Sequence, residues 1–148
     1  MNFAGYDLEA GRNCLPAANN ECDMPKIMVI DDDRQFCGLM KKMLELDGYE
    51  VIATSDLAQA REYLMHDLPD VVCCDLKMPG ASGLDFLSRR GEIDGLVDVP
   101  FVAITGNYSH ASQTQAAELG VFAYLTKPFK PSELTSVIRL ALASTSLG

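Results

Sequence analysis

Basic residues are scarce in this chain, which has 12 lysines and arginines against 21 aspartates and glutamates and a formal charge of −9. A charge of that sign argues against nonspecific binding of nucleic acid. Long apolar runs are also missing, and none approaches the roughly 18 residues that a membrane span needs. The first residues form neither a basic nor an apolar segment, so we expect no secretory signal and no membrane contact.

A cysteine pattern is missing too. The five cysteines include no C-x-x-C pair, and the two histidines, His66 and His110, stand at no spacing typical of a metal site. Cys73 and Cys74 are neighbours in an apolar run, so on a strand they would point to opposite faces. We therefore expect reduced, mostly buried thiols in a cytoplasmic protein.

The remaining features predict one domain. A chain of 148 residues with 48% hydrophobic residues suits a single core. Residues 1–24 lack periodicity and are rich in Asn, Ala and Gly, so we expect a disordered or weakly ordered leader. The patterned part of the chain covers residues 25–146, which we assign to the domain.

Short apolar runs alternate with helical patterns through this domain. Residues 71–75 read VVCCD, a run of small and β-branched residues that suits a strand buried on both faces. We expect four similar strands over residues 26–30, 49–53, 100–104 and 121–125. The alternation predicts an α/β fold, namely a (βα)5 doubly wound parallel sheet.

The intervening helices are predicted from their starts and their apolar stripes. Caps or first-turn residues are expected at Asp33, Ser55, Ser82, Ser109 and Pro131. The first helix shows its stripe at Phe36, Leu39, Met40, Met43, Leu44 and Leu46. The fourth helix has only a thin apolar stripe of Ala111, Ala116 and Leu119, so we expect loose packing there. Two glycines after the third helix predict that it is short and that an irregular connector follows.

Reactive side chains follow four of the expected strands. Asp31 and Asp32 end the first strand, Asp75 ends the third, Thr105 ends the fourth, and Lys127 follows the fifth. The carboxyl ends of parallel strands lie at one edge of the sheet, where ligands bind. We therefore expect these five side chains to meet in one cleft.

Three neighbouring carboxylates repel one another, which raises at least one pKa unless a cation is present. Hard oxygen ligands suit Mg²⁺ or Mn²⁺. A metal and an ammonium together neutralise the oxygens of a phosphoryl group in transfer, and an aspartate can be the nucleophile that forms an acyl phosphate. The cleft therefore suggests a metal-assisted phosphoryl-aspartate site.

Four ordered motifs resemble the receiver domain of two-component response regulators: Val29-Ile30-Asp31-Asp32-Asp33, Asp75-Leu76-Lys77-Met78-Pro79-Gly80, Ala103-Ile104-Thr105-Gly106 and Lys127-Pro128-Phe129. The resemblance runs from residue 26 to about 145. The separations of 43, 30 and 22 residues between Asp32, Asp75, Thr105 and Lys127 also resemble the family's spacing. It implies a flavodoxin-like fold with strand order 2-1-3-4-5 and a receiver domain over residues 25–146.

The resemblance implies a role for each matching residue of the cleft. Asp75 would accept the phosphoryl group. Asp32 and Asp75 would bind Mg²⁺ directly, Asp31 would bind it mainly through water, and the backbone carbonyl of Lys77 would complete the protein ligands. Lys127 would pair with the phosphoryl group and with Asp75.

The resemblance also implies a switch and a set of partners. Thr105 would move toward the phosphoryl oxygen, Tyr124 would rotate inward in response, and the Lys127-Pro128 bond would be cis. A histidine kinase or phosphotransfer protein would donate the phosphoryl group, and an effector protein or effector domain would respond. The domain would be a monomer or a phosphorylation-dependent homodimer. It would catalyse only its own phosphorylation and dephosphorylation and would not bind nucleic acid directly.

Two alternatives stay open at this point. Asp31-Asp32-Asp33 also satisfies the D-x-D motif of haloacid dehalogenase phosphatases, but only Glu133 remains for the acidic pair that this class needs after the lysine, and Asp75 is left without a role. A pseudo-receiver, an interaction module that never takes phosphate, would share the fold. Modification of Asp31 rather than Asp75 by a small phosphodonor would indicate the phosphatase.

Overall fold

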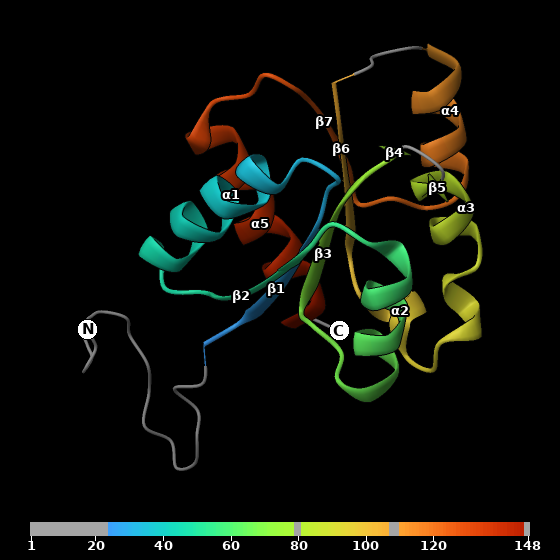
Figure 1. Cartoon of the computed structure of the whole chain (residues 1–148), viewed down its shortest axis with the longest axis horizontal. Coiled ribbons are helices and arrows are strands. Elements are labelled where there is room, and N and C mark those ends of the chain that lie inside the picture. The colour runs from blue at the N-terminus through green and yellow to red at the C-terminus, as the bar shows by residue number, and fades with distance from the viewer. Residues whose placement is uncertain (1–23, 79–80, 107–109, 147–148) are drawn as a thin grey trace.

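The parallel sheet predicted from the sequence is present in the computed structural model, which describes residues 24–78, 81–106 and 110–146 (Figure 1). Its five strands are β1 (Lys26–Ile30), β2 (Glu50–Thr54), β3 (Val71–Asp75), β6 (Phe101–Thr105) and β7 (Ala123–Thr126). The helices are α1 (Arg34–Leu46), α2 (Leu57–His66), α3 (Gly83–Ser88), α4 (His110–Glu118) and α5 (Pro131–Ser146).

The sheet order is β2-β1-β3-β6-β7 and all neighbours are parallel, which confirms the order expected for the flavodoxin-like fold. The order reverses direction between β1 and β3, which pair directly with Ile30 opposite Cys74. The residues that follow these two positions, Asp31 and Asp75, are therefore brought together at the carboxyl edge of the sheet.

Helices cover both faces of the sheet. α1 and α5 lie on one face, and α2, α3 and α4 lie on the other (Figure 1). The central strand β3 is buried along its whole length, as its VVCCD sequence predicts. Cys73 packs into the core under α1 and α5, and Cys74 into the core under α2 and α3. Within the described part of the chain, Cys37, Cys73 and Cys74 are free thiols and buried.

Local signals set most helix starts. The side chain of Asp33 accepts hydrogen bonds from the backbone of Gln35 and Phe36, and Ser82 accepts one from Asp85, so both predicted caps are confirmed. The second helix is capped by Asp56 and not by Ser55, one residue later than expected. The cap expected at Ser109 lies outside the described residues.

Three segment predictions needed adjustment. The second and fourth strands run one residue later than expected, and the last strand begins two residues later, at Ala123. The irregular connector after α3 consists of two short 3-10 helices, η1 (Arg90–Glu92) and η2 (Leu96–Asp98). The loop expected after β3 contains two further short strands, β4 (Lys77–Met78) and β5 (Ala81–Ser82), which pair antiparallel. None of the helices described is both long enough and apolar enough to cross a membrane.

Candidate functional site

Three carboxylates gather where β1 and β3 end. Asp31, Asp32 and Asp75 each place an oxygen within 4.8 Å of those of the other two. Asp31 and Asp75 are buried, with 1% and 6% of their surface exposed, whereas Asp32 is exposed. The acid cluster therefore has a buried floor and one edge open to solvent, as a site for an exchanging ligand requires.

Backbone amides orient the two buried carboxylates. Asp31 Oδ1 accepts a hydrogen bond from the Asp33 amide at 2.9 Å, and Asp75 Oδ1 accepts one from the Lys77 amide at 3.0 Å. The Asp31 amide itself donates to the Thr54 carbonyl of the neighbouring strand at 3.1 Å. One oxygen of each carboxylate is thus held by the chain, and the second oxygen, Oδ2, contacts Lys127 in both cases.

Lys127 reaches the acid cluster from the carboxyl end of β7, the outer strand beside β6. Its amide donates to the Thr105 carbonyl at 2.8 Å, which extends the pairing of β6 with β7 by one residue. Its Nζ lies 2.6 Å from Asp31 Oδ2 and 3.6 Å from Asp75 Oδ2. The Lys127-Pro128 bond is cis, as the family resemblance implied. The sequence argument paired Lys127 with Asp75, and the structure adds Asp31 as the nearer partner.

Charge and burial shift the pKa values at this site. Burial is the main cause that raises the pKa of Asp75, and repulsion by Asp31 and Asp32 raises it further. The hydrogen bond from the Lys77 amide and the attraction of the Lys127 ammonium lower this pKa but do not cancel the rise. Burial alone would lower the pKa of Lys127, but its hydrogen bond with Asp31 and the attraction of Asp31 and Asp75 outweigh burial and raise it. The structure therefore favours a charged Lys127 and makes a charged Asp75 costly without a further cation.

The two residues of the expected switch lie on β6 and β7. Thr105 ends β6 and is 2% exposed. Tyr124 is half-buried on β7 and packs against the small apolar cluster of Leu76, Ala103 and Ala116. Its hydroxyl lies 3.0 Å from the Ser112 hydroxyl on α4. Tyr124 therefore connects the sheet to helix α4.

Two residues of the site were not singled out from the sequence. Gly83, at the start of α3, lies so close to β3 that an added Cβ would come within 2.3 Å of the Asp75 carbonyl oxygen. Phe36 places its ring 4.1 Å from Lys127 Nζ, measured to the ring centroid. A side chain in the first turn of a helix leans back toward the helix N-terminus, so the position of Phe36 three residues after the cap was the available signal.

The donor set fits a divalent cation with a preference for oxygen. Mg²⁺ takes oxygen ligands at about 2.0–2.1 Å in an octahedron, so ligand oxygens around one ion lie roughly 3–4 Å apart. The carboxylate oxygens of Asp31, Asp32 and Asp75 lie within 4.8 Å of one another, which matches that requirement with small adjustments. A donor set of three aspartates favours Mg²⁺ or Mn²⁺ over zinc or copper.

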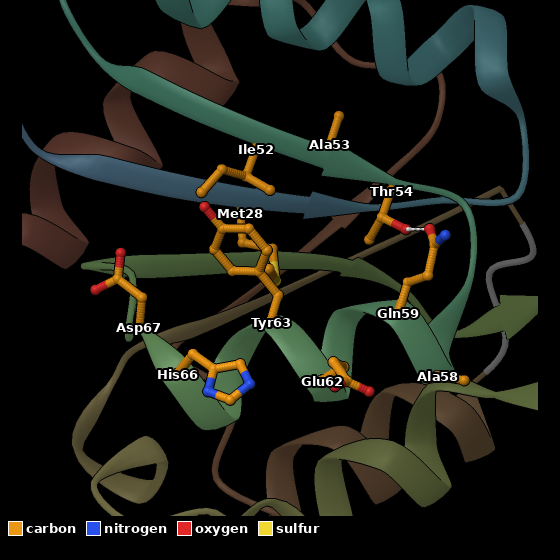
Figure 2. Close-up of a pocket in the computed structure, with 10 residues that line it drawn as sticks. All are labelled: Met28, Ile52, Ala53, Thr54, Ala58, Gln59, Glu62, Tyr63, His66 and Asp67. Atoms are coloured by element: carbon orange, nitrogen blue, oxygen red, sulfur yellow. Dashed lines mark hydrogen bonds between the residues drawn. The ribbon is translucent and has the colours of Figure 1, made fainter.

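A separate cavity of about 660 Å³ lies between β2 and α2, on the other side of β1 from β3 (Figure 2). Ile52 and Ala53 from β2 and Tyr63 from α2 line it, and Thr54 Oγ1 donates to Gln59 Oε1 at 3.0 Å near one end. Neither the acid cluster nor Lys127 lines this cavity. The chemistry described above therefore belongs to the carboxyl edge of the sheet and not to this cavity.

Comparisons with known proteins agree with this fold. Residues 27–139 match the response regulator receiver domain family. The transcriptional regulatory protein CpxR of Escherichia coli K12 is 35% identical over 119 residues, which cover 80% of this chain and 50% of CpxR. The chain thus spans about half the length of the curated relatives that it matches.

Solved structures show the same architecture. A response regulator receiver domain protein from Clostridium thermocellum superposes with a TM-score of 0.77 at 31% identity, covering 84% of this chain and 98% of that one. The receiver domain of the sensor histidine kinase PA1611 from Pseudomonas aeruginosa PAO1, described with magnesium in its active site cleft, has a TM-score of 0.74 at 23% identity and covers 82% and 99%.

The parallel sheet carries an acid cluster and a lysine at one edge, an arrangement that fits a receiver domain. The chain belongs to the response regulator receiver domain family, and it is a phosphoacceptor receiver domain of the two-component type. The family assignment favours the receiver prediction over the haloacid dehalogenase phosphatase.

Proposed function

We propose that Asp75 accepts a phosphoryl group from the phosphohistidine of a histidine kinase or phosphotransfer protein. The observation that carries this proposal is the juxtaposition of Asp75 with two further aspartates and with Lys127. Asp75 ends the central strand β3, beside the other two aspartates. A phosphatase mechanism that uses Asp31 would leave Asp75 without a role. The same residues would catalyse later hydrolysis of the acyl phosphate.

The hydrogen bonds of Asp75 indicate which of its oxygens reacts. Oδ1 accepts the Lys77 amide, so Oδ2 is the nucleophile. In the transfer, Asp75 Oδ2 forms a bond to phosphorus while the bond from phosphorus to the donor histidine nitrogen breaks and its electron pair stays on the imidazole. Lys127 stands 3.6 Å from Oδ2 and neutralises negative charge on the phosphoryl oxygens.

A divalent cation would bind at the acid cluster. We assign direct ligation to Asp32 and Asp75, ligation through water to Asp31, and a fourth contact to the backbone carbonyl of Lys77. Mg²⁺, or Mn²⁺ in its place, supplies the positive charge that offsets the phosphoryl oxygens when it is bound. The raised pKa of Asp75 supports this assignment, because burial and the neighbouring acids make its charged form costly until a cation arrives.

The response to phosphorylation would pass through Thr105 and Tyr124. Thr105 would donate its hydroxyl to a phosphoryl oxygen, and Tyr124 would turn into the space that Thr105 leaves. The contact of Tyr124 with Ser112 supports this proposal, since rotation of the ring would change how α4 sits on the sheet. The face of α4, β7 and α5 would bind an effector protein or effector domain, or a second copy of the chain.

The donor would approach along α1. A groove of about 590 Å³ between α1 and the segment after β7 is lined mainly by apolar residues, and Lys127 forms part of it. Leu39 is 57% exposed on this face. A helix of the donor that lay in the groove would bring its phosphohistidine close to the acid cluster. The buried free thiols support a reducing, cytoplasmic location for this exchange.

A single experiment tests the assignment of the acceptor. The purified chain is incubated with acetyl phosphate and Mg²⁺, and the phosphorylated residue is located by mass spectrometry after borohydride trapping. We expect one phosphoryl group on Asp75, none in Asp75→Asn, and none when EDTA removes the metal. Phosphate on Asp31 would indicate a phosphatase, and no modification together with no spectral response to beryllofluoride would indicate a pseudo-receiver.

A further inference from the structure

The ammonium of Lys127 has an aromatic neighbour in addition to its two carboxylates. The ring of Phe36 on α1 lies over it, with the centroid 4.1 Å from Nζ. That distance falls within the roughly 6 Å over which a cation is attracted to the negative face of an aromatic ring. The Lys127 ammonium therefore contacts both the acid cluster and the face of the Phe36 ring.

The Phe36 ring is itself held in place. Its backbone amide donates to the capping carboxylate of Asp33 at 3.2 Å, which fixes the first turn of α1. Its ring makes an edge-to-face contact with Phe129, with centroids 6.0 Å apart and an interplanar angle of 85°. Phe129 follows Lys127 by two residues, so the lysine and the aromatic pair are linked through the same short segment.

We propose that Phe36 is a positioning residue that keeps the Lys127 ammonium at the mouth of the acid cluster. A lysine side chain has a flexible four-carbon stem and a strongly hydrated charge, so an unrestrained ammonium spends time in solvent. The Phe36 ring gives the ammonium a further attraction besides those of the two carboxylates. The consequence for phosphoryl transfer rests on the function proposed above, while the contact itself does not.

An aromatic ring differs from an aliphatic side chain at this position. Leucine would fill similar space and keep the stripe of α1 apolar, but it has no ring face to attract the ammonium. Tyrosine would keep the face. The pair of variants Phe36→Leu and Phe36→Tyr therefore separates attraction by the ring from simple packing. Leu46→Ala, at an exposed position at the end of the same helix and outside the groove, is the control.

The first readout is the NMR signal of the Lys127 side chain. A ring face 4.1 Å from Nζ shifts the Hε and Hζ resonances of Lys127 upfield through its ring current. We expect this upfield shift in the wild type and in Phe36→Tyr, and its loss in Phe36→Leu. Random-coil positions for these resonances in the wild type would overturn the proposal whatever the chain does with phosphate.

The second readout is the affinity for beryllofluoride in the presence of Mg²⁺, followed by amide chemical shifts. We expect the half-saturating concentration to rise about 3–10-fold in Phe36→Leu, as the strength of a cation–π contact predicts. Phe36→Tyr and Leu46→Ala should stay within about 2-fold of the wild type, since each leaves an aromatic face at position 36. Unchanged affinity in Phe36→Leu, or an equal loss in Phe36→Leu and Phe36→Tyr, would overturn the positioning role.

The two readouts separate this inference from the function on which it rests. If the wild-type chain shows no chemical-shift response to beryllofluoride and Mg²⁺, the proposed function is refuted. The proposed effect of Phe36 on phosphoryl transfer is then refuted with it. The Lys127 resonances would still decide whether the ring holds the ammonium. Thermal unfolding of each variant shows whether Phe36→Leu is folded, and the Lys127 resonances of the wild type keep the test decisive if it is not.

Discussion

Lys127 Nζ lies 2.6 Å from Asp31 Oδ2 and so provides a counter-charge for the most deeply buried carboxylate of the site. The same ammonium is 3.6 Å from Asp75, the residue that we propose accepts phosphate. One lysine thus balances two carboxylates without contacting both equally. The charge that it leaves unbalanced on Asp75 is what a divalent cation would neutralise.

Removing this ammonium should destabilise the metal-free domain. Lys127→Ala leaves Asp31 buried without its partner, which in a fully buried pair costs about 3–5 kcal/mol. Because the Lys127 side chain is 24% exposed, water screens part of the charge, and we expect a loss of about 2–3 kcal/mol. Urea unfolding measures this loss. Saturating Mg²⁺ should restore most of it by replacing the counter-charge.

A surface lysine provides the control for that measurement. Lys41 makes an exposed pair with Glu45 at 3.7 Å on α1, so Lys41→Ala should change the free energy of unfolding by less than about 0.5 kcal/mol. A Lys127→Ala variant as stable as Lys41→Ala without metal would show that Asp31 does not depend on the lysine. Full uptake of phosphate by Lys127→Ala would contradict its role in transfer.

The raised pKa of Asp75 predicts a gain in the free energy of unfolding when its charge is removed, whereas removal of the Lys127 charge predicts a loss. A carboxyl whose pKa is higher in the folded chain binds a proton more readily there, so its contribution to stability falls as the pH rises above the unfolded value of about 3.9. At neutral pH and without metal, Asp75→Asn should therefore be more stable than the wild type. The asparagine Oδ1 can still accept the hydrogen bond from the Lys77 amide, and Lys127 still forms its ion pair with Asp31.

Thermal unfolding across pH 4–8 checks this expectation. We expect a gain of about 1 kcal/mol, or roughly 3–5 °C for a domain of this size, at neutral pH. The gain should shrink as the pH falls toward the unfolded pKa, and Mg²⁺ should stabilise only the wild type. Asp94→Asn, at an exposed position, is the control. An Asp75→Asn variant less stable than the wild type at neutral pH without metal would refute the account of Asp75.

The sequence allowed the acid cluster to be predicted because the alternation of strands and helices places strand ends together. The strands that lead to these side chains have clear boundaries, and each strand ends at or just before Asp31, Asp75 or Thr105. An error of one residue in a boundary therefore did not move these residues away from the carboxyl edge. The preference of Lys127 for Asp31 rests on side-chain distances of 2.6 Å to Asp31 and 3.6 Å to Asp75, and no spacing in a sequence encodes them.

Two further features were hidden by patterns that have an ordinary explanation. Phe36 was counted as part of the apolar stripe of α1, yet its ring faces Lys127, while Leu39 and Leu46 of the same stripe are 57% and 88% exposed. Gly83 follows a helix cap, where a glycine is unremarkable. Only the distance to the Asp75 backbone, set by the packing of α3 on β3, shows why a side chain does not fit.

Gly83→Ala should therefore disturb the acceptor without touching its carboxylate. The added Cβ would lie 2.3 Å from the Asp75 carbonyl oxygen and 2.7 Å from Leu76 Cα, and backbone atoms cannot move aside cheaply. We expect a loss of about 1–3 kcal/mol in stability, typical of overpacking. A weaker response to beryllofluoride should accompany it, because the end of β3 must shift.

A second glycine makes this a matched comparison. Gly38 lies in α1 with nothing within 4 Å of an added Cβ, so Gly38→Ala should stabilise the domain by about 0.5–1 kcal/mol through helix propensity. Its beryllofluoride affinity should equal that of the wild type. A Gly83→Ala variant that behaved like Gly38→Ala in both measurements would show that α3 can move away from β3 at little cost.

The contact between Tyr124 and Ser112 predicts how easily the switch operates. The two hydroxyls are 3.0 Å apart, and this hydrogen bond must break if the Tyr124 ring turns inward. Its removal in Ser112→Ala should favour the switched state by roughly 0.5–1 kcal/mol, which corresponds to a 2–5-fold higher affinity for beryllofluoride with Mg²⁺. Tyr124→Phe keeps the ring and loses the same hydrogen bond, so it should show the same gain.

The double variant decides whether the two residues act through one another. If both hydroxyls serve only this hydrogen bond in the switch, Ser112→Ala combined with Tyr124→Phe should bind beryllofluoride no more tightly than either single variant. Additive gains would show that each hydroxyl acts separately. A lower affinity in Ser112→Ala would mean that the bond belongs to the switched state, and Tyr124 would then be held by Ser112 after phosphorylation and not before it.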